Sequence, residues 1–116
     1  MVYLLETELP ENKLVFLALK NVYGIGRSKS AFICKQLGFC FGLKVKELTE
    51  EQIIKLLKLI ESSDLIITSD LKKLKQLITK NLVAIKSYRG LRKIHGFPVR
   101  GQRTHTNAKT AKKNKR

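Results

Sequence analysis

Side chains that could bind a polyanion are concentrated between Ser87 and Asn107 and continue into the lysines behind them. Arginine is frequent here, whereas the rest of the chain uses mostly lysine. A guanidinium can hold two phosphate oxygens or stack on a base, and glycine lets the main chain approach a ligand closely. Hydroxyls, amides and an imidazole can bond phosphates, base edges or a 2′-hydroxyl. We therefore predict nucleic-acid contacts, to RNA in particular if a 2′-hydroxyl is bound, at Tyr88, Arg89, Gly90, Arg92, Lys93, Arg100, Gly101, Gln102, Arg103, Thr104, His105, Thr106, Asn107, Lys109, Lys112 and Lys113.

The distribution of charge supports this prediction. The last acidic residue is Asp70, and residues 71–116 contain fifteen Lys and Arg. The formal net charge of +15 therefore lies entirely in this region, because the charges of residues 1–70 balance. Such asymmetry indicates a polyanionic partner, although a solvated, disordered basic tail is the alternative. The Arg, Gly and Pro spacing argues against disorder for residues 88–107, whereas disorder remains our expectation for residues 108–116.

A second possible phosphate site lies in the segment Tyr23-Gly24-Ile25-Gly26. Two helices joined by a Gly-x-Gly turn form a helix-hairpin-helix pattern. Such a turn aims backbone N–H groups at a phosphate, and we expect Gly24, Gly26, Arg27 and Lys29 to contribute. The alternative is that the two glycines only make a tight turn. A dinucleotide fold is excluded because the third glycine and a preceding strand are missing.

The elements that position these residues are predicted to be mainly helical. Val2–Leu9 is expected to be extended. Residues 11–22 are expected to form an amphipathic helix whose buried positions are Val15, Ala18, Leu19 and Val22. The next helix is expected to start near Ser28 and to end at Gly38.

Three further helices are predicted. Thr49 and Gln52 form a capping box at the start of the third helix, which buries Ile53, Leu56, Leu57 and Ile60. A connector follows at residues 62–67. The fourth helix begins near Ser69 or Asp70, and its aliphatic stripe is typical of a core helix. The fifth runs from Tyr88 to His95 and ends at Gly96.

These elements predict an all-α protein with two parts. Residues 1–86 are expected to form a helical head domain, and residues 87–116 a basic, Arg- and Gly-rich RNA-binding extension. The chain length suits one small domain with an extension rather than two domains.

Other function classes lack the residues they need. No cluster of titratable groups forms a catalytic constellation, so we expect neither an enzyme nor a cofactor. Cys34 and Cys40 lack a CxxC pair, and His95 and His105 lack metal-ligand spacing, so no metal site is expected. No apolar run is long enough to span a membrane, and no membrane partner is expected. A helix-hairpin-helix module of a DNA repair system remains the alternative function.

The C-terminal sequence resembles a known family. Tyr88-Arg89-Gly90-Leu91-Arg92, followed by the run from Gly96 to Ala108, closely resembles the signature of the universal small-subunit ribosomal protein thirteen family. The segments Tyr23–Gly26 and Leu43–Glu50 also match that family's pattern, so the resemblance covers nearly the whole chain. Lys86 is a departure, because many members have glycine there.

The resemblance implies a helix-two-turns-helix head followed by an extended basic tail. It also implies a structural protein of the small-subunit head that binds small-subunit ribosomal RNA. Further implied partners are a neighbouring small-subunit protein of the nineteen family, large-subunit bridge elements and peptidyl-site transfer RNA. The excess of Lys over Arg fits an AT-rich organellar genome. We therefore expect a ribosome of the mitochondrial matrix rather than of a bacterial cytoplasm or a plastid.

Overall fold

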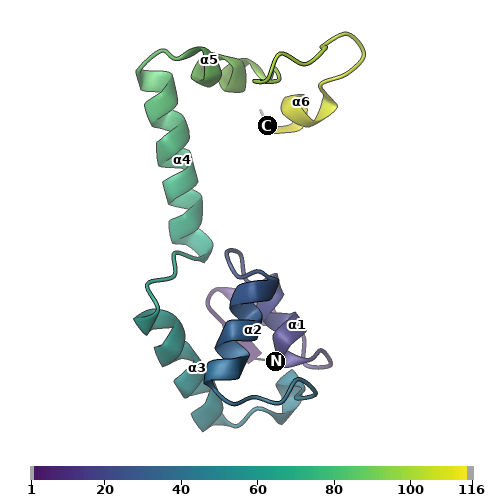
Figure 1. The fold of residues 1–116 in the computed structure, drawn as a ribbon, viewed down its shortest axis with the longest axis vertical. Coiled ribbons are helices and arrows are strands. Elements are labelled where there is room, and N and C mark those ends of the chain that lie inside the picture. The colour runs from purple at the N-terminus through teal and green to yellow at the C-terminus, as the bar shows by residue number, and fades with distance from the viewer. Residues whose placement is uncertain (1, 115–116) are drawn as a thin grey trace. The chain divides into compact units, whose positions relative to one another are not determined.

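The computed structural model describes residues 2–114, which are mostly helical. Figure 1 follows the elements along the chain, and the predicted all-α class is confirmed apart from one small sheet. In chain order the elements are β1 (Val2–Leu4), β2 (Thr7–Leu9), α1 (Val15–Ala18), the 3-10 turn η1 (Leu19–Asn21), α2 (Arg27–Gln36), the 3-10 turn η2 (Val45–Glu47), α3 (Glu50–Ser62), α4 (Thr68–Ala84), α5 (Tyr88–His95) and α6 (Lys109–Asn114).

The chain divides into two compact units, Met1–Lys72 and Lys73–Arg116. The division lies inside α4, upstream of the boundary at residue 86 that the sequence suggested. Among the described residues, no helix is both long and apolar enough to cross a bilayer.

The predicted extended segment Val2–Leu9 is a hairpin rather than one strand. β1 and β2 pair antiparallel, with Val2 opposite Leu9 and Leu4 opposite Thr7. Leu5 and Glu6 both have positive φ, which matches the twist that a two-residue hairpin needs. The reversal was missed because neither residue is a usual turn former at these angles. Its result is that Leu4 and Leu9 both enter the core.

The first predicted helix is shorter than expected. Residues 11–14 are not helical, because this segment pairs with the approach to η2: Val15 N–H donates to Leu43 O at 2.9 Å, and Val45 N–H donates to Lys13 O at 3.0 Å. The helix therefore begins only at Val15. The predicted buried positions, Val15, Ala18, Leu19 and Val22, are confirmed as core residues.

The core of the first unit lies among α1, α2 and α3. Ser30 is fully buried, and its hydroxyl donates to Phe16 O at 2.6 Å, so α2 is tied to α1 by a satisfied polar contact. On α3 the predicted capping box is confirmed, since Thr49 Oγ1 accepts from Gln52 N–H and Gln52 Oε1 accepts from Thr49 N–H. Leu56 and Ile60 are buried as predicted, whereas Ile53 and Leu57 are only half-buried.

Helix α4 is not the core helix that its aliphatic stripe predicted. None of its residues is buried, and Leu74, Leu77 and Ile78 remain exposed. Periodicity identified the helix correctly, but it shows only that an apolar face exists, not that the same chain covers that face. The prediction of a core helix was therefore wrong.

The junction between α4 and α5 is well defined. Lys86 adopts a positive φ of 55°, a conformation that glycine accepts without strain. Ser87 Oγ donates to Leu82 O at 2.8 Å and accepts from Gly90 N–H at 3.1 Å, which caps α5 as predicted. A Cβ on Gly90 would lie 2.5 Å from Leu82 O, so α5 can cross the end of α4 only with glycine here.

The region beyond α5 is irregular up to residue 108. Gly96 ends α5 in the left-handed conformation, as predicted. The expectation of disorder for residues 108–116 was wrong for Lys109–Asn114, which form α6. Residues 115 and 116 lie outside the described residues. The short helix follows from a run of Ala and Lys, which are good helix formers.

The two glycines of the hairpin before α2 have different roles. Gly24 has a φ of 105°, and an added Cβ would lie 3.1 Å from Ile67 Cα. Tyr23 O also accepts from Thr68 N–H at 2.8 Å, so this turn packs directly against the start of α4. Gly26 has an ordinary φ of −101°, and a Cβ there would meet nothing within 4 Å. The fold therefore requires glycine at position 24 but not at position 26.

This difference predicts the effect of two matched substitutions on stability. Gly24→Ala should lower the free energy of unfolding by about 1–3 kcal/mol, because alanine is strained at this φ and crowds Ile67. Gly26→Ala should change it little, because a weaker helix cap is offset by the lower entropy of the unfolded chain. Urea denaturation followed by circular dichroism measures both. Equal losses would contradict the assignment.

Candidate nucleic-acid interface

The unit Lys73–Arg116 carries a surface of exposed cations and polar groups. This unit has no acidic side chain, so its positive charge is not compensated within it. The predicted contact residues that are exposed are Tyr88, Arg89, Lys93, Arg100, Gly101, Gln102, Arg103, Thr104, His105, Thr106, Asn107, Lys109, Lys112 and Lys113. An RNA backbone can reach this surface without any rearrangement of a core.

Two of the predicted contact residues are not exposed and instead stabilise the fold. Gly90 is buried against the carbonyl of Leu82. Arg92 is half-buried, and its Nε donates to Pro98 O at 3.2 Å. Residue type alone could not separate these two from their exposed neighbours.

Arg92 holds together the turn after α5. Its guanidinium carbon lies 4.9 Å from the ring centre of Phe97 and 5.7 Å from that of Tyr88. Phe97 N–H also donates to Arg92 O at 2.9 Å. Cation–π packing and a hydrogen bond thus fix the direction in which the chain leaves α5. This contact determines where the exposed residues that follow can lie.

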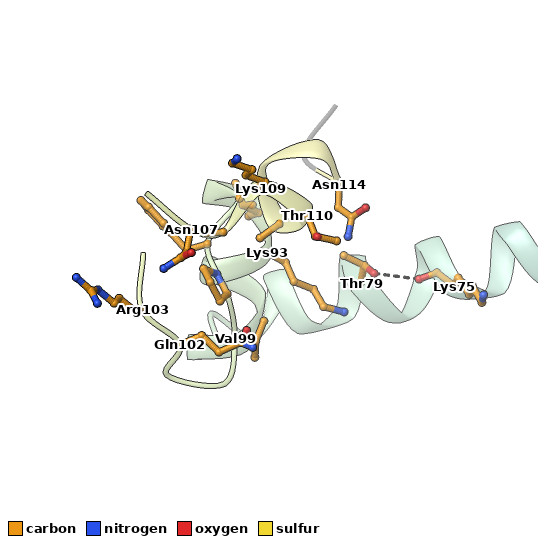
Figure 2. Close-up of a pocket in the computed structure, with 16 residues that line it drawn as sticks. Lys75, Thr79, Lys93, Val99, Gln102, Arg103, Asn107, Lys109, Thr110 and Asn114 are labelled. Carbon is orange, nitrogen blue, oxygen red and sulfur yellow. Dashed lines mark hydrogen bonds between the residues drawn. The ribbon is translucent and has the colours of Figure 1, made fainter. Parts of the chain in front are cut away.

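The same unit contains an open cavity of about 1200 Å³ (Figure 2). Of the predicted contact residues, Lys93, Gln102, Arg103, Asn107 and Lys109 line it together. Sequence reasoning missed other members of the lining, which come from α4, α5, the following turn and α6: Lys75, Thr79, Ile94, Phe97, Pro98, Val99, Thr110 and Asn114. Their signal was weak because the four segments are separated in sequence. Figure 2 shows Lys93 extending from α5 toward α4 and Thr79.

The helix-hairpin-helix turn belongs to the first unit. Gly26 is the N-cap of α2, and no side chain caps that end. The first N–H groups of a helix have no partner inside the helix and favour an anion. Arg27 is exposed beside them, whereas Lys29 Nζ donates to Gly24 O at 3.2 Å and so also holds the turn. This geometry suits phosphate contact by Gly26 and Arg27 in particular.

The cysteines do not form a reactive or metal-binding centre with their neighbours. Cys34 is buried in the core, and burial raises the pKa of its thiol, which favours the neutral form. Cys40 is exposed. Within residues 2–114, no three His, Cys, Asp or Glu side chains are grouped so that they could hold a metal ion.

Comparison with known proteins shows that the chain is similar to one family of ribosomal proteins. Residues 3–110 match the family described as ribosomal protein S13/S18. The chain is 46% identical to "Small ribosomal subunit protein uS13m" of Marchantia polymorpha over 97% of this chain and 93% of that protein. It is 43% identical to "Small ribosomal subunit protein uS13" of Akkermansia muciniphila over 100% of this chain and 93% of that protein.

A fungal relative extends the range of organisms. "Small ribosomal subunit protein uS13m" of Schizosaccharomyces pombe is 44% identical over 97% of this chain and 74% of that protein. The family match covers the Gly24–Gly26 turn of the first unit and the exposed surface of the second up to Thr110. The chain therefore belongs to the ribosomal protein S13/S18 family, whose members are structural components of the ribosome rather than enzymes.

Proposed function

We propose that this protein binds small-subunit ribosomal RNA as a structural component of the small-subunit head. The observation that carries the proposal is an exposed set of arginines and lysines in a unit without acidic side chains. They lie on α5, on α6 and on the segment between them, whose first turn is held by Arg92. Fixed turns with bidentate donors suit a folded RNA, because phosphate contacts of this kind set the position and orientation of a protein. The family match favours this function over a role in DNA repair.

Two parts of the protein would bind the ribosomal RNA. In the second unit, Arg89, Arg100 and Arg103 would hold phosphates of the ribosomal RNA. In the first unit, the hairpin before α2 would receive another phosphate through the N–H groups beside Gly26. Because the exposed α6 carries Lys109, Lys112 and Lys113, we assign it to peptidyl-site transfer RNA as a short helix of positive charge.

The remaining partners follow from membership of the family. The protein would contact a neighbouring small-subunit protein of the nineteen family and bridge elements of the large subunit. The compartment we propose is the mitochondrial matrix. Support comes from 18 lysines against 6 arginines in this chain and from relatives named uS13m, although bacterial relatives are equally similar.

The first test of this function is the salt dependence of binding to refolded small-subunit ribosomal RNA. For about six to ten phosphate contacts, affinity should fall ~10³–10⁵-fold between about 50 and 200 mM salt, because bound cations are released from the RNA. Filter binding measures the slope, with duplex DNA of similar length as the control. Equal affinity for RNA and duplex DNA at both salt concentrations would rule out a specific ribosomal role.

A second test removes two exposed arginines. The double variant Arg100→Ala with Arg103→Ala should weaken binding to the ribosomal RNA at least about tenfold and lower occupancy in purified small subunits, because charge-assisted contacts are lost. Lys55→Ala with Lys58→Ala is the matched control, since it removes two exposed charges from α3 in the charge-balanced region. If the control impairs incorporation as strongly, total charge rather than the proposed surface determines binding.

A third test separates the structural arginine from an exposed one. Arg92→Lys keeps the charge but loses the Nε bond to Pro98 and the planar packing, so binding should weaken by about 1–2 kcal/mol. Arg89→Lys should weaken binding less, by about 0.5–1 kcal/mol, because it loses a bidentate contact but keeps the charge and leaves the turn after α5 intact. Isothermal titration with refolded ribosomal RNA compares the two. A larger effect of Arg89→Lys would mean that bidentate contact at Arg89 outweighs the fixed turn.

A further inference from the structure

The cavity between α4, α5 and α6 has a lining that phosphate binding alone does not explain. Three of its side chains are amides, at Gln102, Asn107 and Asn114. Each amide presents a donor and an acceptor side by side, which is the pattern found on base edges. A site for phosphate alone needs donors only. The amides therefore indicate a ligand that offers both donors and acceptors.

The apolar part of the lining points the same way. Ile94, Phe97 and Val99 are among the apolar side chains of the lining. Phe97 is still 41% exposed although Arg92 packs over its ring. RNA-binding proteins commonly recognise unpaired bases by stacking them on such aromatic side chains. The ring of Phe97, over which Arg92 packs, thus offers a surface against which a flat apolar ligand can lie.

The cations at the cavity complete the chemistry. Lys93, Arg103 and Lys109 line it, and no acidic side chain does. A cationic ligand is therefore disfavoured, whereas an anionic group attached to the flat ligand is favoured. The cavity volume of about 1200 Å³ exceeds the roughly 300–1,000 Å³ of common small-ligand pockets, which leaves room for a base together with its flanking phosphates.

We propose that this cavity receives one unpaired nucleotide of the ribosomal RNA, extruded from its helix. The base lies against Phe97 and its edge bonds to Gln102 and Asn107, while Lys93 and Arg103 hold the adjacent phosphates. This inference rests on the proposed function and makes it more specific. Three of these five contacts would then be to the base and two to the backbone, so the protein would distinguish RNA structures of equal charge.

The test uses two double variants of the full chain that leave the net charge unchanged. Gln102→Ala with Asn107→Ala alters the cavity. Gln76→Ala with Asn81→Ala removes the same side-chain types from exposed positions of α4 outside the cavity lining. All four residues are exposed, and circular dichroism establishes that helicity is equal in the two variants.

The measurement combines two footprints on refolded small-subunit ribosomal RNA. Hydroxyl-radical cleavage reports the backbone, and base-specific alkylation reports the Watson–Crick edges. The wild-type protein should protect the edge of an unpaired nucleotide within its backbone footprint. The cavity variant should lose this protection and bind about tenfold more weakly while keeping a backbone footprint, and the α4 variant should match the wild type.

A second measurement needs no variant. Ultraviolet cross-linking of the wild-type complex, followed by peptide mapping, should identify a nucleotide attached at or beside Phe97. The inference is overturned if the cavity variant keeps the base protection or if the wild type protects no unpaired base. In each of these cases a wild-type backbone footprint would leave the proposed function intact, whereas loss of that footprint would refute both.

Discussion

Repulsion among like charges is the constraint on which the second unit depends. Without acidic side chains, it cannot use ion pairs between side chains to hold its helices together. It relies instead on contacts that need no opposite charge. These are the close approach of Gly90 to the backbone of α4, the cap at Ser87, and the packing of Arg92 between Tyr88 and Phe97. Arg92 is thus turned inward and stiffens the unit, whereas Lys93, Arg100 and Arg103 are exposed on its surface.

The parts of the fold that were predicted correctly are those encoded by neighbouring residues. The capping box at Thr49, the end of α2 at Gly38 and the cap of α5 at Ser87 each depend on a few consecutive residues. The start of α1 depends on pairing with residues 43–45, and the hairpin turn depends on Leu5 and Glu6 adopting an unusual conformation. Sequence patterns describe neighbouring residues and not contacts with distant segments. The start of α1 and the hairpin turn were therefore not predicted.

The candidate site divides in the same way. Residue type identified the arginine- and glycine-rich surface, because bidentate donors and flexible backbone are properties of single residues. It did not reveal that Gly90 is buried or that Arg92 bonds to Pro98, since these roles arise only when α5 meets α4 and the following turn. Residue types also could not predict the cavity, because four separate segments of the chain form the lining. The residue types of this surface could therefore be identified from the sequence, whereas their arrangement in space could not.

The exposed aliphatic face of α4 has a consequence for the protein before it reaches its partner. Leu74, Leu77 and Ile78 form apolar surface on the helix that also carries exposed lysines. In the free protein, a net charge of +15 keeps molecules apart and so protects this surface from self-association. Neutralisation by RNA removes that protection, and screening by salt weakens it. A polyanion that neutralises the lysines without covering the aliphatic face is therefore expected to promote self-association of the protein.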